Sequence, residues 1–500
     1  MSRTGAKGRS PRLGLPGRLP RKIAALVVLL SFVVVPTAGA AQEIPPSEKP
    51  NIVYILTDDL DTYTLNQMET TSSLLANQGV TFKNATFSDP LCCPSRATMQ
   101  RGQYPHNTGV KTNVPPNGGF EAFYDDELYE STYATWLDAA GYHTGYFGKY
   151  MNGYEGEFAR FVPPGWDRWF AAVAGPMKKQ FNDNGTIVSN ENLESRTFDQ
   201  TVATKGLRFI ENRAPSTTPF MVAFNFYAPH GPAEHPASLD DLYQDAELPP
   251  DPSFSEADVS DKPQWVQSFD QVDSEERQAL TEFHRDRLRS VEYIDQAVAT
   301  IVRTIARSGE LENTYIVFWA DNGYHLGQHR LQKQTTGGKL SPYTHDVELP
   351  MYVRGPDIPA GTISRKMVSN VDIAPTLAAM GGASVPSFVD GRSMLALARG
   401  KTVEWRRFAY SAAWPQSGAM PMGMEDWRQI RTTEFAYHYY PRTGEEELYD
   451  LKGDPYQLAN LLHGDVSDKE ETLRARYRNL AERMNTCSGA VCRNIEQRRS

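Results

Sequence analysis

The chain has 500 residues, of which 40% are hydrophobic and 11% aromatic, with 37 glycines, 34 prolines and a formal net charge of −10. The glycine and proline contents exclude a collagen-like or low-complexity chain, and the hydrophobic content is sufficient for a folded core. The acidic balance argues against nucleic acid as a partner, because binding to phosphates requires a basic surface.

The first 40 residues have the three-part pattern of a secretory signal peptide. Residues 1–22 carry seven basic side chains and no acidic one, and an apolar run follows from Ile23 to Val35. Small residues follow at 37–40, as is typical of the cleavage site of a signal peptide. A membrane anchor is the alternative, but this apolar run is short for a membrane span. We therefore predict a secreted protein without stable membrane insertion. Residues 41–500 hold 44 basic and 61 acidic residues, which is a net charge of −17.

After an exposed linker at residues 41–50, short apolar runs alternate with amphipathic segments. This pattern predicts a strand at 51–57, a helix at 67–78, strands at 143–148 and 220–227, a helix at 276–308, and strands at 314–320 and 349–354. Strands that alternate with helices are typical of an α/β fold with a mostly parallel sheet and helices on both of its faces. We expect one such domain over residues 51–399.

The pattern changes after residue 399. Residues 400–500 predict a smaller antiparallel α+β subdomain, with short strands at 408–412, 427–432, 435–440 and 447–450 and a helix at 471–484. Cys487 and Cys492 lie close together near its end and can form a disulfide in an oxidising compartment. Two free thiols are the alternative.

Polar side chains directly follow four of the predicted strands. They are Asp58 with Asp59, Lys149, His230, and Asp321 with Asn322. Ligands bind beyond the carboxyl ends of the strands in open parallel sheets, so we expect these groups to meet at one edge. Each of these residues alone is a weak indication of a functional site, because an acidic pair after a strand is more often a helix cap or a turn. Carboxylate and amide oxygens favour Ca²⁺ or Mg²⁺, whereas zinc would require more histidine or cysteine.

Cys92 and Cys93 belong to the segment Leu91–Gly102, with the sequence LCCPSRATMQRG. Pro94 fits the first turn of a helix and would place the cysteines at its N-terminus. A helix N-terminus attracts anions and lowers the pKa of a thiol, so the segment predicts a nucleophile beside an anion site, with Arg96 nearby. A buried structural cysteine is the alternative.

Cys92-x-Pro94-Ser95-Arg96, with Gly102 six residues beyond the arginine, resembles the signature of the sulfatase family. The resemblance covers nearly the whole chain after the signal peptide and implies an alkaline-phosphatase-like fold. It also implies a separate maturation enzyme that oxidises Cys92 to Cα-formylglycine. One Ca²⁺ is then expected on Asp58, Asp59, Asp321, Asn322 and the formylglycine oxygen from Cys92. Lys149, His230 and Lys339 match the residues that bind sulfate in the family.

The chain is similar in more detail to N-acetylglucosamine-6-sulfatases and to extracellular heparan 6-O-endosulfatases. The shared segments are CCPSR at 92–96, YPHN at 104–107, GKY at 148–150, PPGW at 163–166 and GYH at 323–325. Arylsulfatases of the lysosomal type carry a histidine two residues after the lysine, where this chain has Met151. Our hypothesis is therefore that His325, or water, protonates the leaving alcohol. Four tryptophans are candidates for stacking on a sugar, although each is more often a packing residue: Trp166, Trp169, Trp414 and Trp427.

The resemblance implies hydrolysis of a sulfate ester to an alcohol and inorganic sulfate. One hydroxyl of hydrated formylglycine attacks sulfur and releases the alcohol, and the second then loses its proton as sulfate leaves. Ca²⁺ and the sulfate-binding residues offset the anionic charge, and Arg96 holds the diol. The expected substrate is a sulfated small molecule or glycan, such as 6-sulfated N-acetylglucosamine. The alternatives are a phosphonate or phosphate monoester hydrolase of the same superfamily and a non-catalytic, exported glycan-binding protein.

Overall fold

The structure is a computed structural model that describes residues 49–175, 178–189, 196–214, 217–331, 337–414 and 424–497. The predicted signal peptide lies outside the described residues. Within these ranges, no helix combines the length and the hydropathy needed to cross a membrane.

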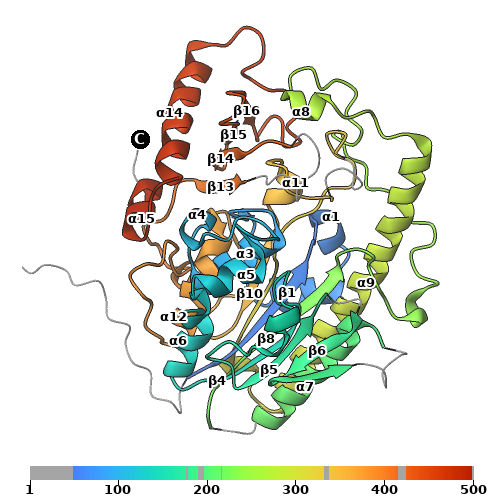
Figure 1. Ribbon diagram of the computed structural model, residues 1–500, viewed down its shortest axis with the longest axis vertical. Coiled ribbons are helices and arrows are strands. Elements are labelled where there is room, and N and C mark those ends of the chain that lie inside the picture. Colours follow the sequence, from blue (N-terminus) through green and yellow to red (C-terminus); the bar gives the residue numbers. More distant parts are fainter. Residues whose placement is uncertain are drawn as a thin grey trace, which may run out of the picture. The chain divides into compact units, whose positions relative to one another are not determined.

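A sheet of ten strands lies at the centre of Figure 1, in the order β11-β2-β10-β9-β1-β8-β4-β5-β6-β7. The neighbours β9, β1, β8, β4 and β5 are parallel, whereas β10 and β6 run antiparallel to both of their neighbours. The mixed, mostly parallel sheet that the sequence predicted is therefore confirmed. The strands are β1 (Asn51–Asp58), β2 (Val80–Phe82), β4 (His143–Gly148), β5 (Arg168–Val173), β6 (Gln180–Asp183), β7 (Thr186–Ser189), β8 (Phe220–Pro229), β9 (Thr314–Ala320), β10 (Met351–Arg354) and β11 (Thr362–Ser364). Two further short strands, β3 (Ala85–Thr86) and β12 (Val368–Ser369), pair in parallel with each other.

The central strands are buried on both faces. Every residue of β1 and of β9 is buried, and both read as nearly continuous apolar runs. Such runs are typical of parallel strands that are covered by helices on both sides. This is why the sequence pattern located these strands correctly.

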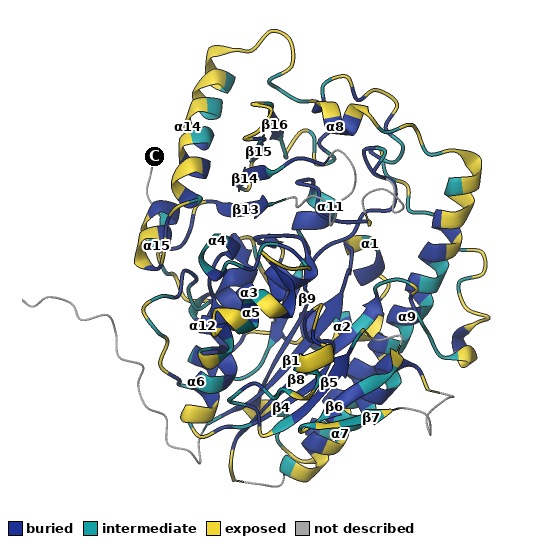
Figure 2. Cartoon of the chain, in the orientation of Figure 1, coloured by how far each residue is buried: buried dark blue, intermediate teal, exposed yellow. Residues whose placement is uncertain are grey.

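Helices cover both faces of the sheet (Figures 1 and 2). On one side, α7 (Phe198–Arg213) and α9 (Ser274–Arg307) pack against β8. On the other, α6 (Tyr133–Ala139) packs against β4 and contacts α3 (Cys92–Arg101) and α12 (Ile373–Met380). The helix predicted at 67–78 consists of α2 (Glu69–Thr71) and a π-helical turn at Ser72–Ala76. The remaining short helices are α1 (Thr62–Leu65), α4 (Pro105–Thr108), α5 (Gly119–Asp125), α8 (Gln264–Gln267), α11 (Thr344–Val347) and α13 (Leu395–Ala398).

The long helix α9 follows directly from its sequence. Its N-cap Asp273 accepts a hydrogen bond from the backbone N–H of Glu276, which satisfies one of the free donors of the first turn. Val291, Ile294 and Val298 recur at helical spacing and are buried on the side that faces the sheet. Figure 2 shows the same division, with a buried inner face and an exposed outer face.

The C-terminal part forms a separate antiparallel sheet, as the sequence predicted. Its strands β13 (Ala409–Ala413), β14 (Trp427–Arg431), β15 (Phe435–Tyr439) and β16 (Glu446–Asp450) pair in chain order. Helix α14 (Asp468–Met484) packs on β14 and β15 and also contacts α15 (Ala490–Gln497). The domain boundary expected at residue 400 stays a prediction.

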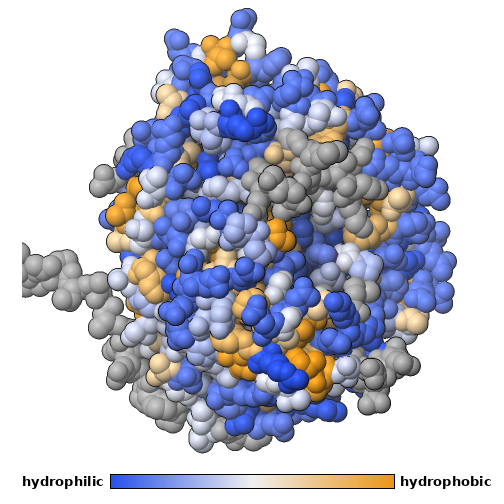
Figure 3. Space-filling model, viewed as in Figure 1, coloured by the Kyte–Doolittle hydropathy of each residue, from blue (hydrophilic) through white to orange (hydrophobic). Residues whose placement is uncertain are grey.

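The two sheets are joined by specific contacts. Ser411 on β13 donates a hydrogen bond to the carbonyl of Phe87 at 2.6 Å. The buried guanidinium of Arg406 pairs with Asp372, at 2.7 Å from Nη2, and with Glu496 on α15, at 3.2 Å from Nε. The predicted disulfide between Cys487 and Cys492 is present and ties the first turn of α15 to the residues before it. The face of the molecule in Figure 3 is mostly hydrophilic, with small scattered apolar areas, as expected for a chain of this charge.

Candidate functional site

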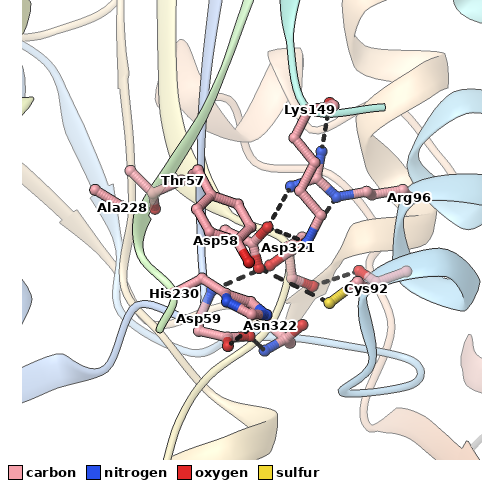
Figure 4. A network of polar contacts seen from close by, with 12 residues as sticks. Thr57, Asp58, Asp59, Cys92, Arg96, Lys149, Ala228, His230, Asp321 and Asn322 are labelled. Atoms are coloured by element: carbon pink, nitrogen blue, oxygen red, sulfur yellow. Dashed lines mark hydrogen bonds and ion pairs between the residues drawn. The ribbon is translucent and has the colours of Figure 1, made fainter. Parts of the chain in front are cut away.

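The carboxyl ends of four neighbouring strands bring the predicted polar residues together (Figure 4). Thr57 on β1 pairs with Ala320 on β9, so Asp58 and Asp321 lie side by side just beyond these residues. On the other side of β1, β8 ends at Pro229, which places His230 at the same edge. The expectation that these groups meet at one edge of the sheet is therefore met by the fold.

Three carboxylates lie buried at the centre of this site. They belong to Asp58, Asp59 and Asp321, none of which is more than 1% exposed. Asp59 has a φ of 60°, in the left-handed region that non-glycine residues rarely adopt. Its side chain accepts a hydrogen bond from Asn322 Nδ2 at 2.7 Å. The backbone at the end of β1 thus adopts an unusual conformation that turns this carboxylate toward Asn322.

Arg96 holds two of these carboxylates in place. Its Nε donates to Asp321 at 2.8 Å and its Nη2 to Asp58 at 3.3 Å, while Nη1 donates to the carbonyl of Lys149 at 3.0 Å. Burial disfavours the charged guanidinium, but the two carboxylates outweigh this and raise the pKa of Arg96. The side chain is therefore a permanent cation within the acidic cluster.

Two lysines also contact the carboxylates. Lys149 forms an ion pair with Asp58, and Lys339 Nζ lies 2.5 Å from Asp59 Oδ1. Burial alone would lower the pKa of both amines, but Asp58 and Asp59 respectively raise it above the usual value. Gly148 directly precedes Lys149 at the end of β4. A Cβ at residue 148 would come within 2.0 Å of the carbonyl oxygen of Asn225. Strands β4 and β8 can approach this closely only because residue 148 is glycine.

Cys92 is the first residue of α3, as the motif predicted, and its thiol faces the cluster. Its Sγ lies 3.2 Å from Lys339 Nζ and 3.8 Å from Asp58 Oδ1. The next residues of the helix fix its position, because Ser95 donates to the carbonyl of Asp321 and accepts from Asn370 Nδ2 at 2.9 Å. Cys93 points away, and its Sγ accepts the backbone N–H of Asn152 at 3.1 Å.

The expectation that the helix N-terminus lowers the pKa of the Cys92 thiol is wrong. Burial raises this pKa to about 11, although Lys149 and Lys339 lower it. Desolvation of the thiolate outweighs the favourable charges because the side chain is only 1% exposed. An unmodified Cys92 is therefore a protonated thiol at neutral pH.

His230 lies at the rim of the cluster, with Nε2 3.6 Å from Asp59 Oδ2. Burial lowers its pKa to about 4, although Asp59 raises it, so the ring is neutral at neutral pH. Its Nδ1 lies 2.8 Å from the carbonyl of Gly231, which can only accept, so Nδ1 carries the proton and Nε2 the lone pair. The ring of Tyr227 stacks on His230 at 4.5 Å and lies 5.3 Å from Lys149 Nζ.

A cavity of about 280 Å³ adjoins this group. Lys149, His230 and Tyr227 line it, together with Met151 and Glu155. The cavity is thus lined by a lysine, a histidine and an acidic residue. It is a space in which a small anionic group could reach the cluster.

Asp199 supports this region, and the sequence analysis did not identify it. Its carboxylate accepts the backbone N–H of Tyr227 at 2.7 Å and of Ala228 at 3.0 Å, and so holds the segment that leads to His230. Burial raises the pKa of Asp199 to about 7, although these two donors lower it. A lone aspartate at the start of a helix offers no sequence signal of this role. Tyr227 could have been found, because it ends a predicted strand three residues before His230.

The raised pKa of Asp199 predicts a pH-dependent stability. Between about pH 4 and pH 7 the folded chain keeps a proton that the unfolded chain has lost. This contribution to stability is complete at low pH and disappears as the pH rises to 7. The variant Asp199→Asn cannot ionise at this position. We therefore expect the melting temperature of the wild type, minus that of the variant, to fall between pH 4 and 7 and to stay constant above pH 7. Thermal unfolding over a pH series measures this, and a pH-independent difference would contradict it.

His325 and the tryptophans complete the set of predicted residues. His325 Nδ1 lies 2.9 Å from both carboxylate oxygens of Asp346, and its backbone N–H donates to Gly338. The structure places it beside the segment that carries Lys339. Three of the tryptophans are buried, with exposures of 8% for Trp166 and 0% for Trp169 and Trp427, so they are packing residues, the role that the sequence favoured for each of them over stacking on a sugar. Trp414 is half-buried, and Arg428 lies over its ring at 4.6 Å.

The oxygen atoms of the cluster suit a hard divalent cation. Asp58, Asp59, Cys92 and His230 offer ligand atoms within 4.8 Å of one another, and Asp321 and Asn322 adjoin them. Asn322 Oδ1 is buried and has no hydrogen-bond partner within the described part of the chain. A buried amide oxygen without a donor is costly, and a cation would satisfy it. The three carboxylates and the amide oxygen therefore fit Ca²⁺ or Mg²⁺.

Comparisons with known proteins agree with this arrangement. A family model described as Sulfatase matches residues 50–383, and one described as N-sulphoglucosamine sulphohydrolase, C-terminal, matches residues 339–485. The chain is 35% identical, over 70% of its length, to a protein of Drosophila melanogaster named extracellular sulfatase SULF-1 homolog. It is 28% identical to human N-acetylglucosamine-6-sulfatase, over 96% of this chain and 92% of that one.

A solved structure has the same fold. It is described as a complex with its substrate D-glucosamine-2-N,6-O-disulfate, and it superposes with a TM-score of 0.74 over 90% of this chain and 99% of that one, at 20% identity. The match to the Drosophila protein covers only 31% of that protein's length. The present chain thus spans less than a third of that relative.

Proposed function

The chain belongs to the sulfatase family, and from this premise we propose that it is a secreted sulfatase that hydrolyses sulfate esters of a sugar to an alcohol and inorganic sulfate. One observation supports this most strongly: Cys92 of the family motif lies within 3.2 Å of Lys339, in a cluster with Lys149 and His230. A sulfate ester is anionic, so cations and hydrogen-bond donors must surround the reacting group. This cluster provides them at the start of a helix.

We propose that Asp58, Asp59, Asp321, Asn322 and the modified Cys92 hold one Ca²⁺. Three buried carboxylates and the unpartnered Asn322 Oδ1 support this choice. When bound, the ion would offset the negative charge of the sulfate as a Lewis acid. Arg96 uses three of its five N–H donors on Asp58, Asp321 and the Lys149 carbonyl, so its proposed role is to orient the metal-binding carboxylates and, with its remaining N–H groups, to hold the diol.

We further propose that a maturation enzyme converts Cys92 to formylglycine. The pKa of about 11 supports this indirectly, because a protonated thiol is a weak nucleophile. Hydrated formylglycine would supply one hydroxyl to attack sulfur and a second whose deprotonation allows sulfate to leave. The proposed role of Lys149, Lys339 and His230 is to bind the sulfate group of the ester, as the family resemblance implies. His325 keeps its proposed role toward the leaving alcohol.

The proposed substrate is a sulfated sugar such as 6-sulfated N-acetylglucosamine. The name of the human relative and the disulfated glucosamine in the solved relative support this. The signal-peptide pattern of residues 1–40 and the extracellular relative support secretion. The proposed organisation is a catalytic domain at 51–399 followed by an α+β subdomain at 400–500.

Mass spectrometry of the peptide that contains Cys92 tests the proposal most directly. In active protein produced with a maturation enzyme, we expect the peptide at the lower mass of the aldehyde. Protein produced without that enzyme should carry the thiol and show background turnover. Paired sulfate and phosphate esters of one alcohol then separate the sulfatase from a phosphate or phosphonate monoester hydrolase. Full sulfatase turnover with an intact thiol at Cys92 would refute the assignment.

A further inference from the structure

A groove of about 970 Å³ lies outside the Cys92 cluster. Its walls come from the edge of the ten-stranded sheet and from the C-terminal antiparallel sheet. They comprise Lys83 and Asn84 after β2, 365–367 between β11 and β12, 403–407 before β13, Thr433 and Glu434 after β14, and Lys452 after β16. None of the residues proposed for catalysis or metal binding belongs to it.

The groove is strongly basic. Six of its side chains are basic and two, Glu404 and Glu434, are acidic. Two of the basic groups are already neutralised, because Arg406 pairs with Asp372 and Glu496, and Lys452 pairs with Glu434. The other four are exposed and form no ion pair with any described residue: Lys83, Arg365, Lys366 and Arg407. This concentration of positive charge contrasts with the net charge of −17 over residues 41–500.

The segments that carry these cations are fixed to one another. Asn84 Nδ2 donates to the carbonyl of Arg365 at 2.8 Å and links the segment after β2 to the one after β11. The buried indole of Trp405 donates to the carbonyl of Met367 at 2.6 Å and links residues 365–367 to residues 403–407. The four cations therefore project from backbone that is held in place, which lowers the entropy cost of binding a ligand.

The groove lies at the same edge of the sheet as the Cys92 cluster. Strands β2 and β11 run parallel to each other, and both are antiparallel to β10, which is itself antiparallel to β9. Lys83 and Arg365 therefore follow strands that point the same way as β1 and β9. The strand order places β2 and β11 three and four positions from β1, which is roughly 14 to 19 Å at about 4.8 Å per strand.

We propose that this groove binds a sulfated polysaccharide at a site distinct from the reaction centre, an assignment that rests on the proposed sulfatase function. Four exposed cations, which outnumber the two carboxylates of the groove, suit a chain with repeated sulfate groups. Trp405 is the only aromatic residue that lines the groove among the described residues, and it is 7% exposed. A single-stranded nucleic acid would instead require exposed rings on which its bases stack. Binding here would hold a polymeric substrate near the site and would leave small esters unaffected.

A charge-reversal pair tests the proposal. In the groove variant, Arg365→Glu and Lys366→Glu are combined. The matched control combines Arg303→Glu and Arg307→Glu on the exposed face of α9, outside the groove. Both variants change the net charge by the same amount, so general repulsion of a polyanion is equal in the two. Affinity for a heparin oligosaccharide of defined length is measured in the full chain that also carries Cys92→Ala, so that the probe is not hydrolysed.

We expect the groove variant to bind the oligosaccharide at least about tenfold more weakly than the control, with a smaller dependence of affinity on salt concentration. Turnover of a small aryl sulfate, measured with Cys92 intact, should be the same in both variants. Equal affinities in the two variants would overturn the proposal. So would a single-stranded oligonucleotide that binds as tightly through the same two residues. If the wild type lacks sulfatase turnover while the difference in affinity persists, the proposed function fails and the groove assignment stands.

Discussion

Replacing Cys92 with alanine is expected to lower sulfatase turnover by at least about a thousandfold, because it removes the atom that becomes the nucleophile. Cys92 is buried, and its Sγ is directed at Lys339 and Asp58, so no other side chain can take its place at the start of α3. Initial rates on an aryl sulfate, at saturating and at low substrate, measure the loss. We expect it in kcat, since the lysines proposed to bind the sulfate are unchanged.

The adjacent cysteine provides a matched control. Cys93 is equally buried, but its sulfur contacts Asn152 rather than the cluster. Cys93→Ser keeps a group that can accept the Asn152 N–H, and it should retain turnover within about tenfold of the wild type. Turnover of Cys92→Ala in that same range would show that the reaction does not proceed through residue 92.

Removal of divalent metal is expected to abolish turnover, and return of Ca²⁺ to restore it. We also expect bound Ca²⁺ to raise the melting temperature. At an ion concentration of a hundred times the Kd, the free energy of unfolding should increase by about 2.7 kcal/mol. The reason is that the folded chain brings the three carboxylates of Asp58, Asp59 and Asp321 together in a buried space, whereas the unfolded chain has no such site. Thermal unfolding with and without chelator gives a readout that does not depend on activity.

Asn322→Ala tests the same site, because it removes the buried oxygen that has no hydrogen-bond partner. We expect this variant to lose most of the thermal shift caused by Ca²⁺. Asn212→Ala, at an exposed position on α7, should keep the full shift. An identical shift in both variants would exclude Asn322 as a ligand. A chelator that changes neither turnover nor melting temperature would exclude the metal site as a whole.

Much of the candidate site could be predicted, because each strand and the polar residue after it lie within one short segment of the sequence. NIVYILT before Asp58 and TYIVFWA before Asp321 are apolar runs of strand length, and a parallel arrangement requires their carboxyl ends to meet. Lys149 and His230 follow from the same argument. Lys339 follows no predicted strand, and only the family resemblance pointed to it. The strands β2, β3, β5, β6, β7, β11 and β12 were not predicted. Apart from β5, they are at most four residues long, which is too short for a periodic pattern.

The sequence by itself determined which residues can reach the site, because the order of apolar runs and the polar residues after them are local properties of the chain. Tertiary structure decided the properties that depend on neighbours distant in sequence. Burial, not the helix N-terminus, sets the pKa of Cys92, and contacts between distant segments direct three N–H donors of Arg96 to Asp58, Asp321 and the Lys149 carbonyl. The basic groove likewise exists only because 365–367 and 403–407 come together with Lys83. Desolvation and charge pairing act through space, so no local pattern in the sequence could reveal them.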